Sequence, residues 1–214
     1  RLGVWLVGLG GGLATTMVCG AKMVARGLAS SSGLITTTPE FSDLDLAGFG
    51  DLVFGGHDVR RFSMFESAYE IYRENGTIPY EALLEIREEL EEVDTEFRLG
   101  SLVNCGPAVE KLADRKVRRQ KHTLGEALRQ IREDIESFRE RNDLRQVIVV
   151  NLASTEPSVA IGPEHRTMAG FRRIIKEDRR QATRASSLYA WGASAAGCPC
   201  SYFPPSHRAR LPPH

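Results

Sequence analysis

The sequence predicts an α/β protein whose core is a doubly wound, mostly parallel sheet with helices on both faces. Two observations support this fold class. Short apolar runs of strand length alternate with longer segments in which apolar residues recur every three or four positions. The first apolar run also enters a glycine-rich turn that opens a helical pattern. We therefore expect the start of the chain to organise the rest.

The first strand, turn and helix are predicted within residues 2–29. An uncharged run at 2–9 suits a strand buried on both faces, and the apolar side chains of 14–28 fall along one helical stripe. Such a unit is the usual phosphate cradle of Rossmann-like sheets, because glycine lets backbone amides approach a pyrophosphate at the amino terminus of the helix. The sequence thus indicates a nucleotide-binding domain.

The glycine motif itself matches this pattern incompletely. Gly8 and Gly10, with Gly11 beside them, provide the first two glycines of G-x-G-x-x-G, but Leu13, followed by Ala14, stands where the third is expected. From the motif alone, a nucleotide loop and a plain tight turn both remain open.

A membrane-spanning helix is an alternative for the same stretch, because residues 2–21 carry no charge. Five glycines between residues 3 and 12 would weaken such a helix, and no signal-peptide pattern is present. We predict no membrane partner.

Composition narrows the classes of function further. The 214 residues are 42% hydrophobic, which suffices for a sizeable core. Lys plus Arg equals Asp plus Glu at 28 each, so no net basic field would recruit nucleic acid. The four cysteines are scattered, and the spacing of Cys198 and Cys200 matches no common zinc site. We expect a cytoplasmic protein without a metal site or a nucleic-acid partner.

Further elements follow from periodicity and from helix-capping signals. Ser63 with Glu66 and Thr123 with Glu126 form capping boxes at two helix starts. We predict strands at 34–38, 51–54, 101–105 and 146–151, and helices at 64–74, 80–97, 124–141 and 182–196. The basic stretch 111–121 has no interleaved aromatic residue and is expected to be a solvated loop.

Two of these helices have an alternative role. The apolar spacing of 80–97 and 124–138 also suits a helical hairpin that pairs with another chain, although two to three heptads is short for a coiled coil. We expect both helices to pack on the sheet.

The segment after the strand at 146–151 is a second candidate ligand site. Ligands of doubly wound sheets bind at the carboxyl ends of the strands, and the small and hydroxyl residues from Leu152 to Glu156 are placed there. A loop that caps the next helix is an equally good interpretation.

Four motifs in the same order resemble the myo-inositol phosphate synthases, also called inositol-3-phosphate synthases. The resemblance runs from Leu2 to about Pro212. Its motifs are Gly8-Leu9-Gly10-Gly11 with Thr15-Thr16, Val53-Phe54-Gly55-Gly56-His57-Asp58, Val149-Val150-Asn151-Leu152-Ala153-Ser154-Thr155-Glu156, and Ser186-Ser187-Leu188-Tyr189-Ala190.

The resemblance implies an NAD-dependent isomerase that converts D-glucose 6-phosphate to a myo-inositol phosphate by transient oxidation, internal aldol closure and re-reduction. It places the pyrophosphate on the glycine loop, the adenine-side ribose on the Asp after Gly-Gly, and the nicotinamide end near the Ala-Ser-Thr segment. Carried over, the cofactor-binding residues are Gly8, Gly10, Gly11, Gly12, Leu13, Asp58, Ala153, Ser154 and Thr155. The predicted strand at 34–38 does not end in the acidic residue that usually binds the ribose hydroxyls, so this role falls to Asp58.

The chain also departs from the family pattern. Gly12 and Leu13 stand where asparagines are frequent, and His57 stands where an aromatic residue often precedes the Asp, so we expect His57 to be a packing or ribose-edge residue. Tyr202-Phe203-Pro204-Pro205-Ser206 stands in place of Asn-Phe-Thr-Pro-Ser, and no Thr-Gly-x-Thr segment with lysines follows. We therefore assign no catalytic residue.

These observations predict the cofactor-binding part of a synthase, truncated and inactive alone, whose sheet is incomplete at its carboxyl end. We expect an NAD-binding domain at 1–197, with a helical insertion at about 62–141, and a proline-rich irregular tail at 198–214. The complete enzyme is expected to be a homo-oligomer. The alternative is a non-catalytic Rossmann-type module that binds a nucleotide or a partner protein. A plain NAD dehydrogenase ranks lower, because no His or Lys has an orienting partner in the sequence pattern.

Overall fold

A five-stranded parallel sheet forms the centre of the computed structural model, which describes residues 1–203. Its strand order is β3-β2-β1-β4-β5, and every neighbouring pair is parallel. The strands are β1 (Leu2–Val7), β2 (Leu52–Asp58), β3 (Phe97–Leu99), β4 (Gln146–Asn151) and β5 (Cys200–Tyr202). The chain first builds outward from β1 to β3 and then returns to the other side of β1, so the order reverses between β1 and β4. The predicted doubly wound α/β fold is confirmed.

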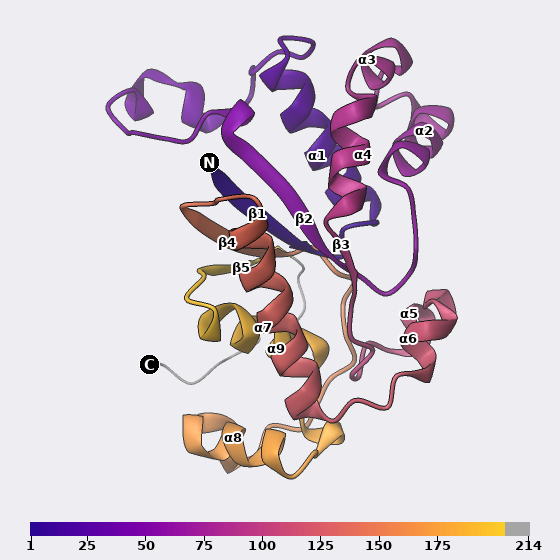
Figure 1. The fold of residues 1–214 in the computed structure, drawn as a ribbon, viewed down its shortest axis with the longest axis vertical. Helices are drawn as coiled ribbons and strands as arrows, with labels where there is room; N and C mark the ends of the chain where they lie inside the picture. Colours follow the sequence, from indigo (N-terminus) through magenta and orange to yellow (C-terminus); the bar gives the residue numbers. More distant parts are fainter. Residues whose placement is uncertain (204–214) are drawn as a thin grey trace.

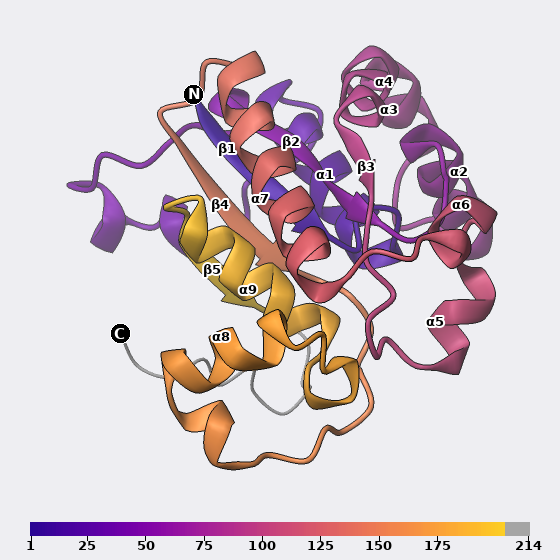
Figure 2. The same ribbon diagram turned by 60° about the horizontal axis from the view of Figure 1, so that its bottom comes forward.

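Helices cover both faces of this sheet (Figure 1). One face carries α1 (Gly12–Ala25), α2 (Met64–Asn75), α3 (Tyr80–Glu85) and α4 (Arg87–Thr95), and the other carries α7 (Leu124–Arg141), α8 (Met168–Lys176) and α9 (Ala185–Ala195). The short helices α5 (Pro107–Leu112) and α6 (Arg115–Arg119) connect β3 to α7 and lie beside the carboxyl ends of the strands (Figure 2).

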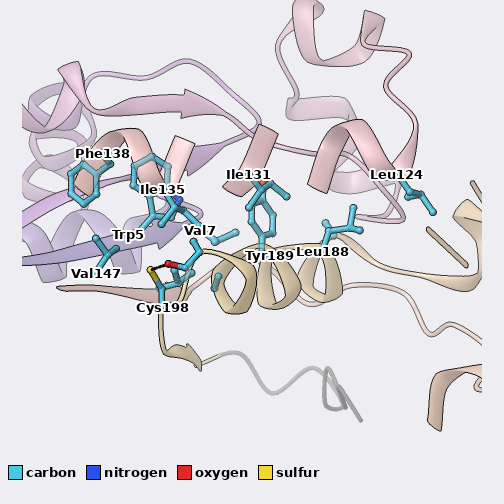
Figure 3. Close-up of a cluster of buried hydrophobic side chains, with 14 of the residues drawn as sticks. Trp5, Val7, Leu124, Ile131, Ile135, Phe138, Val147, Leu188, Tyr189 and Cys198 are labelled. Carbon is cyan, nitrogen blue, oxygen red and sulfur yellow. Dashed lines mark hydrogen bonds between the residues drawn. The ribbon is translucent and has the colours of Figure 1, made fainter. Parts of the chain in front are cut away.

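Alternation along the strands divides the core into two clusters. Trp5 and Val7 of β1 belong to the cluster under α7 and α9, whereas Leu6, between them, belongs to the cluster under α1, α2 and α4. Successive strand residues point to opposite faces, so an uninterrupted apolar run can fill both. Figure 3 shows the first cluster, with Phe138, Ile135 and other side chains of α7 directed toward β1 and α9.

Helices α7 and α9 pack closely because α9 has a glycine, Gly192, where the two helices meet. A Cβ atom at Gly192 would lie 2.5 Å from the Ile131 side chain, so only glycine fits there without displacing it. The helix predicted at 182–196 is present as α9, although it begins three residues later, at Ala185. The apolar side chains of α4 and α7 are buried within this chain, as expected of helices that pack on a sheet.

The predicted strand at 34–38 is wrong. Residues Ile35–Thr37 and Pro39–Phe41 form two 3₁₀ turns, η1 and η2. The hydroxyl groups of Thr37 and Thr38 donate to the backbone carbonyls of Leu34 and Ile35, and the Ile35 side chain is 68% exposed. β-Branched residues favour strands where they pack on a pleated surface, and this segment has no such neighbour.

The region between residues 80 and 105 differs from prediction in two places. The helix expected at 80–97 is divided at Ile86 into α3 and α4. The strand expected at 101–105 lies earlier, at Phe97–Leu99, where it pairs with Gly56–Asp58 of β2. The amphipathic spacing extends past the end of α4, so periodicity alone could not place this boundary.

The two segments that were expected to be irregular contain regular structure. Residues 111–121 include the end of α5 and all of α6. The tail expected from residue 198 begins with β5, which pairs with Val149–Asn151 of β4. Residues 204–214 of that tail lie outside the described residues. The edge strands β3 and β5 are three residues each, and within residues 1–203 each pairs on one side only.

The strand at 51–54 extends to Asp58, whereas the helices at 64–74 and 124–141 and the strand at 146–151 are confirmed with nearly the expected bounds. Within residues 1–203, no helix has the combined length and apolar character needed to cross a bilayer.

Phe138→Ala should remove about 3–5 kcal/mol from the free energy of unfolding, because Phe138 is fully buried against Trp5 with ring centroids 5.0 Å apart. Urea unfolding of the purified chain measures this change. Ile35→Ala is the matched control, and its exposed side chain should change the free energy by no more than about 0.5 kcal/mol. Equal effects of the two substitutions would contradict the assignment of Phe138 to the core.

Candidate nucleotide-binding site

Two loops meet at the carboxyl edge of the sheet, where the strand order reverses. Gly8 follows β1 with φ +90°, a conformation that favours glycine. A Cβ atom at Gly8 would lie 3.1 Å from both the Cα and the backbone nitrogen of Ala153, in the loop after β4. Gly8 is therefore required both for the turn and for the close approach of the two loops, and the structure brings these two predicted site residues together.

The backbone amides of the glycine loop divide into a bonded and an unbonded group. The amides of Gly8 and Leu9 donate to the carbonyl of His57 at 2.8 and 3.1 Å, and that of Gly10 donates to Oδ2 of Asp58 at 2.9 Å. The amide of Gly11 donates to the carbonyl of Gly8 at 3.0 Å. The loop thus uses three of these donors to hold itself against the end of β2 and the fourth to close its own turn.

The next three amides, at residues 12–14, have no acceptor within residues 1–203. Gly11 is the N-cap residue of α1 and offers no side chain, and the first turn of α1 contains no acidic residue. These amides point along the helix axis and carry the positive end of its dipole, so an anion can accept from them. The geometry suits a phosphate group at the start of α1.

Asp58 ends β2, the strand beside β1. The residue is 9% exposed, and its carboxylate accepts from the Gly10 amide and, through Oδ1, from the Arg60 amide at 3.0 Å. In Rossmann-like sheets the acid that binds ribose hydroxyls sits at the end of this strand. Here it comes far later in the sequence than usual, because residues 26–51 leave the sheet and return before β2. Two of about four lone-pair sites of the carboxylate remain for ribose hydroxyls.

The loop after β4 is hydrogen-bonded to the end of β1 and to the start of α9. The Leu152 amide donates to the carbonyl of Val7, and the Asn151 side chain accepts from the Ala153 amide. Glu156 accepts from the Ser186 amide at 2.8 Å and from the Ser186 hydroxyl, so its carboxylate sits at the start of α9. The next helix in the chain, α8, is capped by Thr167, so the interpretation of this segment as a cap for the next helix is wrong. The segment borders a cavity, and its role as a ligand site stays a prediction.

Burial raises the pKa of Glu156 above its ordinary value, although the two hydrogen bonds from Ser186 oppose the shift. The carboxylate is the negative group at the positive end of α9, and its removal from water is the larger effect.

A cavity of about 270 Å³ lies between these loops. Gly8, Gly11, Asp58, Ala153 and Ser154 line it, whereas Gly10, Gly12, Leu13 and Thr155 do not. Gly10 faces Phe62, and Leu13 is 49% exposed at the start of α1. A larger cavity of about 470 Å³ is lined by the loop after β3 with α6 and α7, and by none of the predicted site residues.

Several residues that line the cavity between the two loops were not predicted as site residues from the sequence. Ser186 and Tyr189 belong to a motif that was recognised without being assigned a role, and Arg60 stands two residues after Asp58. The others, Ser101, Cys105, Val109 and Leu112, follow β3. They carry no motif, and their position depends on the placement of β3, which the sequence pattern did not give.

His57 is a buried packing residue, as expected. Its side chain is 1% exposed, its Nδ1 accepts from Nε1 of Trp5, and its Nε2 lies 3.0 Å from Oδ2 of Asp134. An indole N–H can only donate, so Nδ1 carries no proton and Nε2 donates to the carboxylate. This chain of hydrogen bonds fixes the residue whose carbonyl holds the glycine loop.

Three comparisons with known proteins all find similarity to inositol phosphate synthases. The family described as "Myo-inositol-1-phosphate synthase" matches residues 2–213. The chain is 29% identical over 215 residues to inositol-3-phosphate synthase 1 of Bacteroides thetaiotaomicron, an alignment that covers 93% of this chain and 47% of the relative. It also resembles the crystal structure of inositol-3-phosphate synthase from Caenorhabditis elegans, with a TM-score of 0.76, 20% identity, and coverage of 94% of this chain and 43% of that one. The chain thus spans about half the length of the relatives it matches.

Glu156→Gln should make stability less sensitive to pH. Because the folded-state pKa of Glu156 is raised, the wild-type chain loses stability as the pH rises from the ordinary glutamate value of 4.5 through the folded-state pKa. Glutamine cannot ionise and still accepts from the Ser186 amide. Urea unfolding between pH 4 and pH 8 should show the wild type losing stability relative to the variant. The exposed Glu81→Gln serves as control, and parallel pH profiles for all three chains would contradict the assignment.

Proposed function

Because the chain belongs to the myo-inositol-1-phosphate synthase family, we propose that it is the NAD-binding part of an enzyme that converts D-glucose 6-phosphate to a myo-inositol phosphate. One observation carries the proposal. Gly11, Asp58 and the loop after β4 line one cavity at the point where the strand order reverses, and the three unbonded amides at the start of α1 follow directly after Gly11. This is the place at which doubly wound sheets bind dinucleotides.

The residues fit NAD by their chemistry. The amides of Gly12 and Leu13 would receive the pyrophosphate, and the free lone pairs of Asp58 would accept the adenine-side ribose hydroxyls. Ala153 and Ser154 would border the nicotinamide end, where small side chains leave room for the ring. Thr155 is exposed outside the cavity, so its predicted role is the least supported. When bound, NAD supplies reversible hydride acceptance from the sugar.

The aldol closure requires a positive group beside a developing enolate. None of the five lysines lines the cavity, and the cation among its lining residues, Arg60, donates to the Gly10 carbonyl of the glycine loop. Lys22 hydrogen-bonds to the carbonyl of Leu52 at the opposite, amino edge of β2, and burial lowers its pKa. We therefore assign no catalytic residue within this chain and propose that it binds the cofactor without converting the sugar by itself.

A stand-alone nucleotide-binding module is the alternative function. It would bind a nucleotide in the same cavity but would not be part of an enzyme that converts the sugar. Pairing with a partner through residues 80–97 and 124–138 has less support, because the apolar positions Leu90, Val93, Ile131 and Ile135 are buried within this chain. We propose a homo-oligomer for the complete enzyme. All four cysteines are free thiols, which supports a reducing compartment such as the cytoplasm.

Isothermal titration calorimetry should detect NAD binding to the purified chain with a micromolar dissociation constant. Asp58→Ala should weaken binding about tenfold or more, because it removes charge-assisted hydrogen bonds to the ribose and releases the Gly10 amide. Asp51→Ala, in an exposed residue before β2, is the matched control. A folded wild-type chain that does not bind NAD would overturn the proposed cofactor. Product formation from glucose 6-phosphate by this chain alone would refute the assignment of catalysis to groups outside it.

A further inference from the structure

Arg60 is a half-buried cation at the cavity that the proposed roles do not use. It lies two residues after β2, lines the cavity, and its guanidinium donates to the carbonyl oxygen of Gly10. Within residues 1–203, no carboxylate oxygen lies within 4 Å of its guanidinium nitrogens. Its neighbour Arg61, by contrast, pairs with Asp114 at 3.6 Å. The charge of Arg60 is thus available to a ligand.

The position of Arg60 is set by the glycine loop. The Arg60 amide donates to Oδ1 of Asp58, and the Asp58 Oδ2 atom accepts from the Gly10 amide. The Arg60 side chain then closes this small ring by donating to the Gly10 carbonyl. The guanidinium is therefore held beside the loop that leads into the unbonded amides of residues 12–14.

A guanidinium has five N–H donors, and the Gly10 carbonyl occupies only part of this set. Its planar, forked arrangement matches the oxygens of a phosphate group, with hydrogen bonds about twice as strong as those between neutral groups. Gly12 and Leu13 offer no side-chain donor at the start of α1. The site thus has unbonded backbone donors at the start of α1 and, beside the glycine loop, a cation that has no carboxylate partner within the described residues.

We infer that Arg60 is a phosphate-binding residue of this site and that its guanidinium donates to the pyrophosphate of the bound dinucleotide. This inference rests on the proposed function. The 2′-phosphate of NADP has the same chemistry, but under the proposed function the Asp58 carboxylate would accept the ribose hydroxyls, and its negative charge would repel a phosphate there. The Gly10 carbonyl, which holds Arg60, belongs to the loop that faces the pyrophosphate. The geometry therefore points to the pyrophosphate.

Arg60→Gln tests the inference, because a glutamine amide can still donate to the Gly10 carbonyl but carries no charge. Arg61→Gln is the matched control, since it removes the adjacent cation from outside the cavity. NAD, NADP and adenosine are titrated into each folded chain by calorimetry. Arg60→Gln should weaken NAD binding about ten- to a hundredfold and leave adenosine binding within about twofold of the wild type. Arg61→Gln should bind all three ligands like the wild type.

A second variant, Arg60→Lys, keeps the charge without the fork, and its NAD affinity should lie between those of the wild type and Arg60→Gln. It also provides a test if Arg60→Gln does not fold. Unchanged NAD binding in the variants, or an equal loss for NAD and adenosine, would overturn the inference and leave Arg60 a structural role. A loss confined to NADP would overturn the pyrophosphate assignment. A wild-type chain that binds none of the ligands would refute the proposed function as well, whereas wild-type NAD binding with unchanged variants refutes this inference alone.

Discussion

The glycine loop and the cavity beside it depend on one buried residue near the end of β2. The carbonyl of His57 accepts two amides of the glycine loop, while its imidazole is held between the Trp5 indole and the Asp134 carboxylate of α7. His57 thus connects the core on the α7 side of the sheet, through its side chain, to the glycine loop at the carboxyl edge of the sheet, through its backbone. A buried, fully paired polar group of this kind holds one geometry, because any displacement would leave a donor or an acceptor unsatisfied.

At the same edge of the sheet, the loop after β1 meets the loop after β4, although these two strands are far apart in the sequence. Gly8 packs directly on Ala153, and Glu156 fixes the remainder of that loop to Ser186 at the start of α9. The Ser186 carbonyl in turn accepts from the Tyr202 hydroxyl of β5 at 2.6 Å. The cavity is therefore bounded by elements that hold one another, and this pre-organisation suits a ligand whose phosphates and sugars must be received by many small contacts at once.

Sequence reasoning succeeded where a local pattern and its tertiary environment agree. The Thr123–Glu126 capping box and the apolar spacing after it placed α7, and the apolar run from Val147 to Val150 placed β4. It failed at 34–38, where β-branched residues had no surface to pack on, and at 101–105, where the true strand starts at Phe97 directly after a helix. Of the residues that line the cavity, the sequence pointed to the two loops and Asp58 but not to Arg60, whose side chain is held by a carbonyl fifty positions away in the chain.

By itself, the sequence determined the alternation of strands and helices, the glycine loop between β1 and α1, and the motifs that indicate the family. These features are local, since they depend on periodicity, capping and turn chemistry within a few residues. Only the tertiary structure decided which glycine-loop amides remain free, which predicted residues line the cavity, and that Arg60 lacks a carboxylate partner within residues 1–203. Those facts depend on strand order and on side-chain contacts between distant segments, and local periodicity contains no information about either.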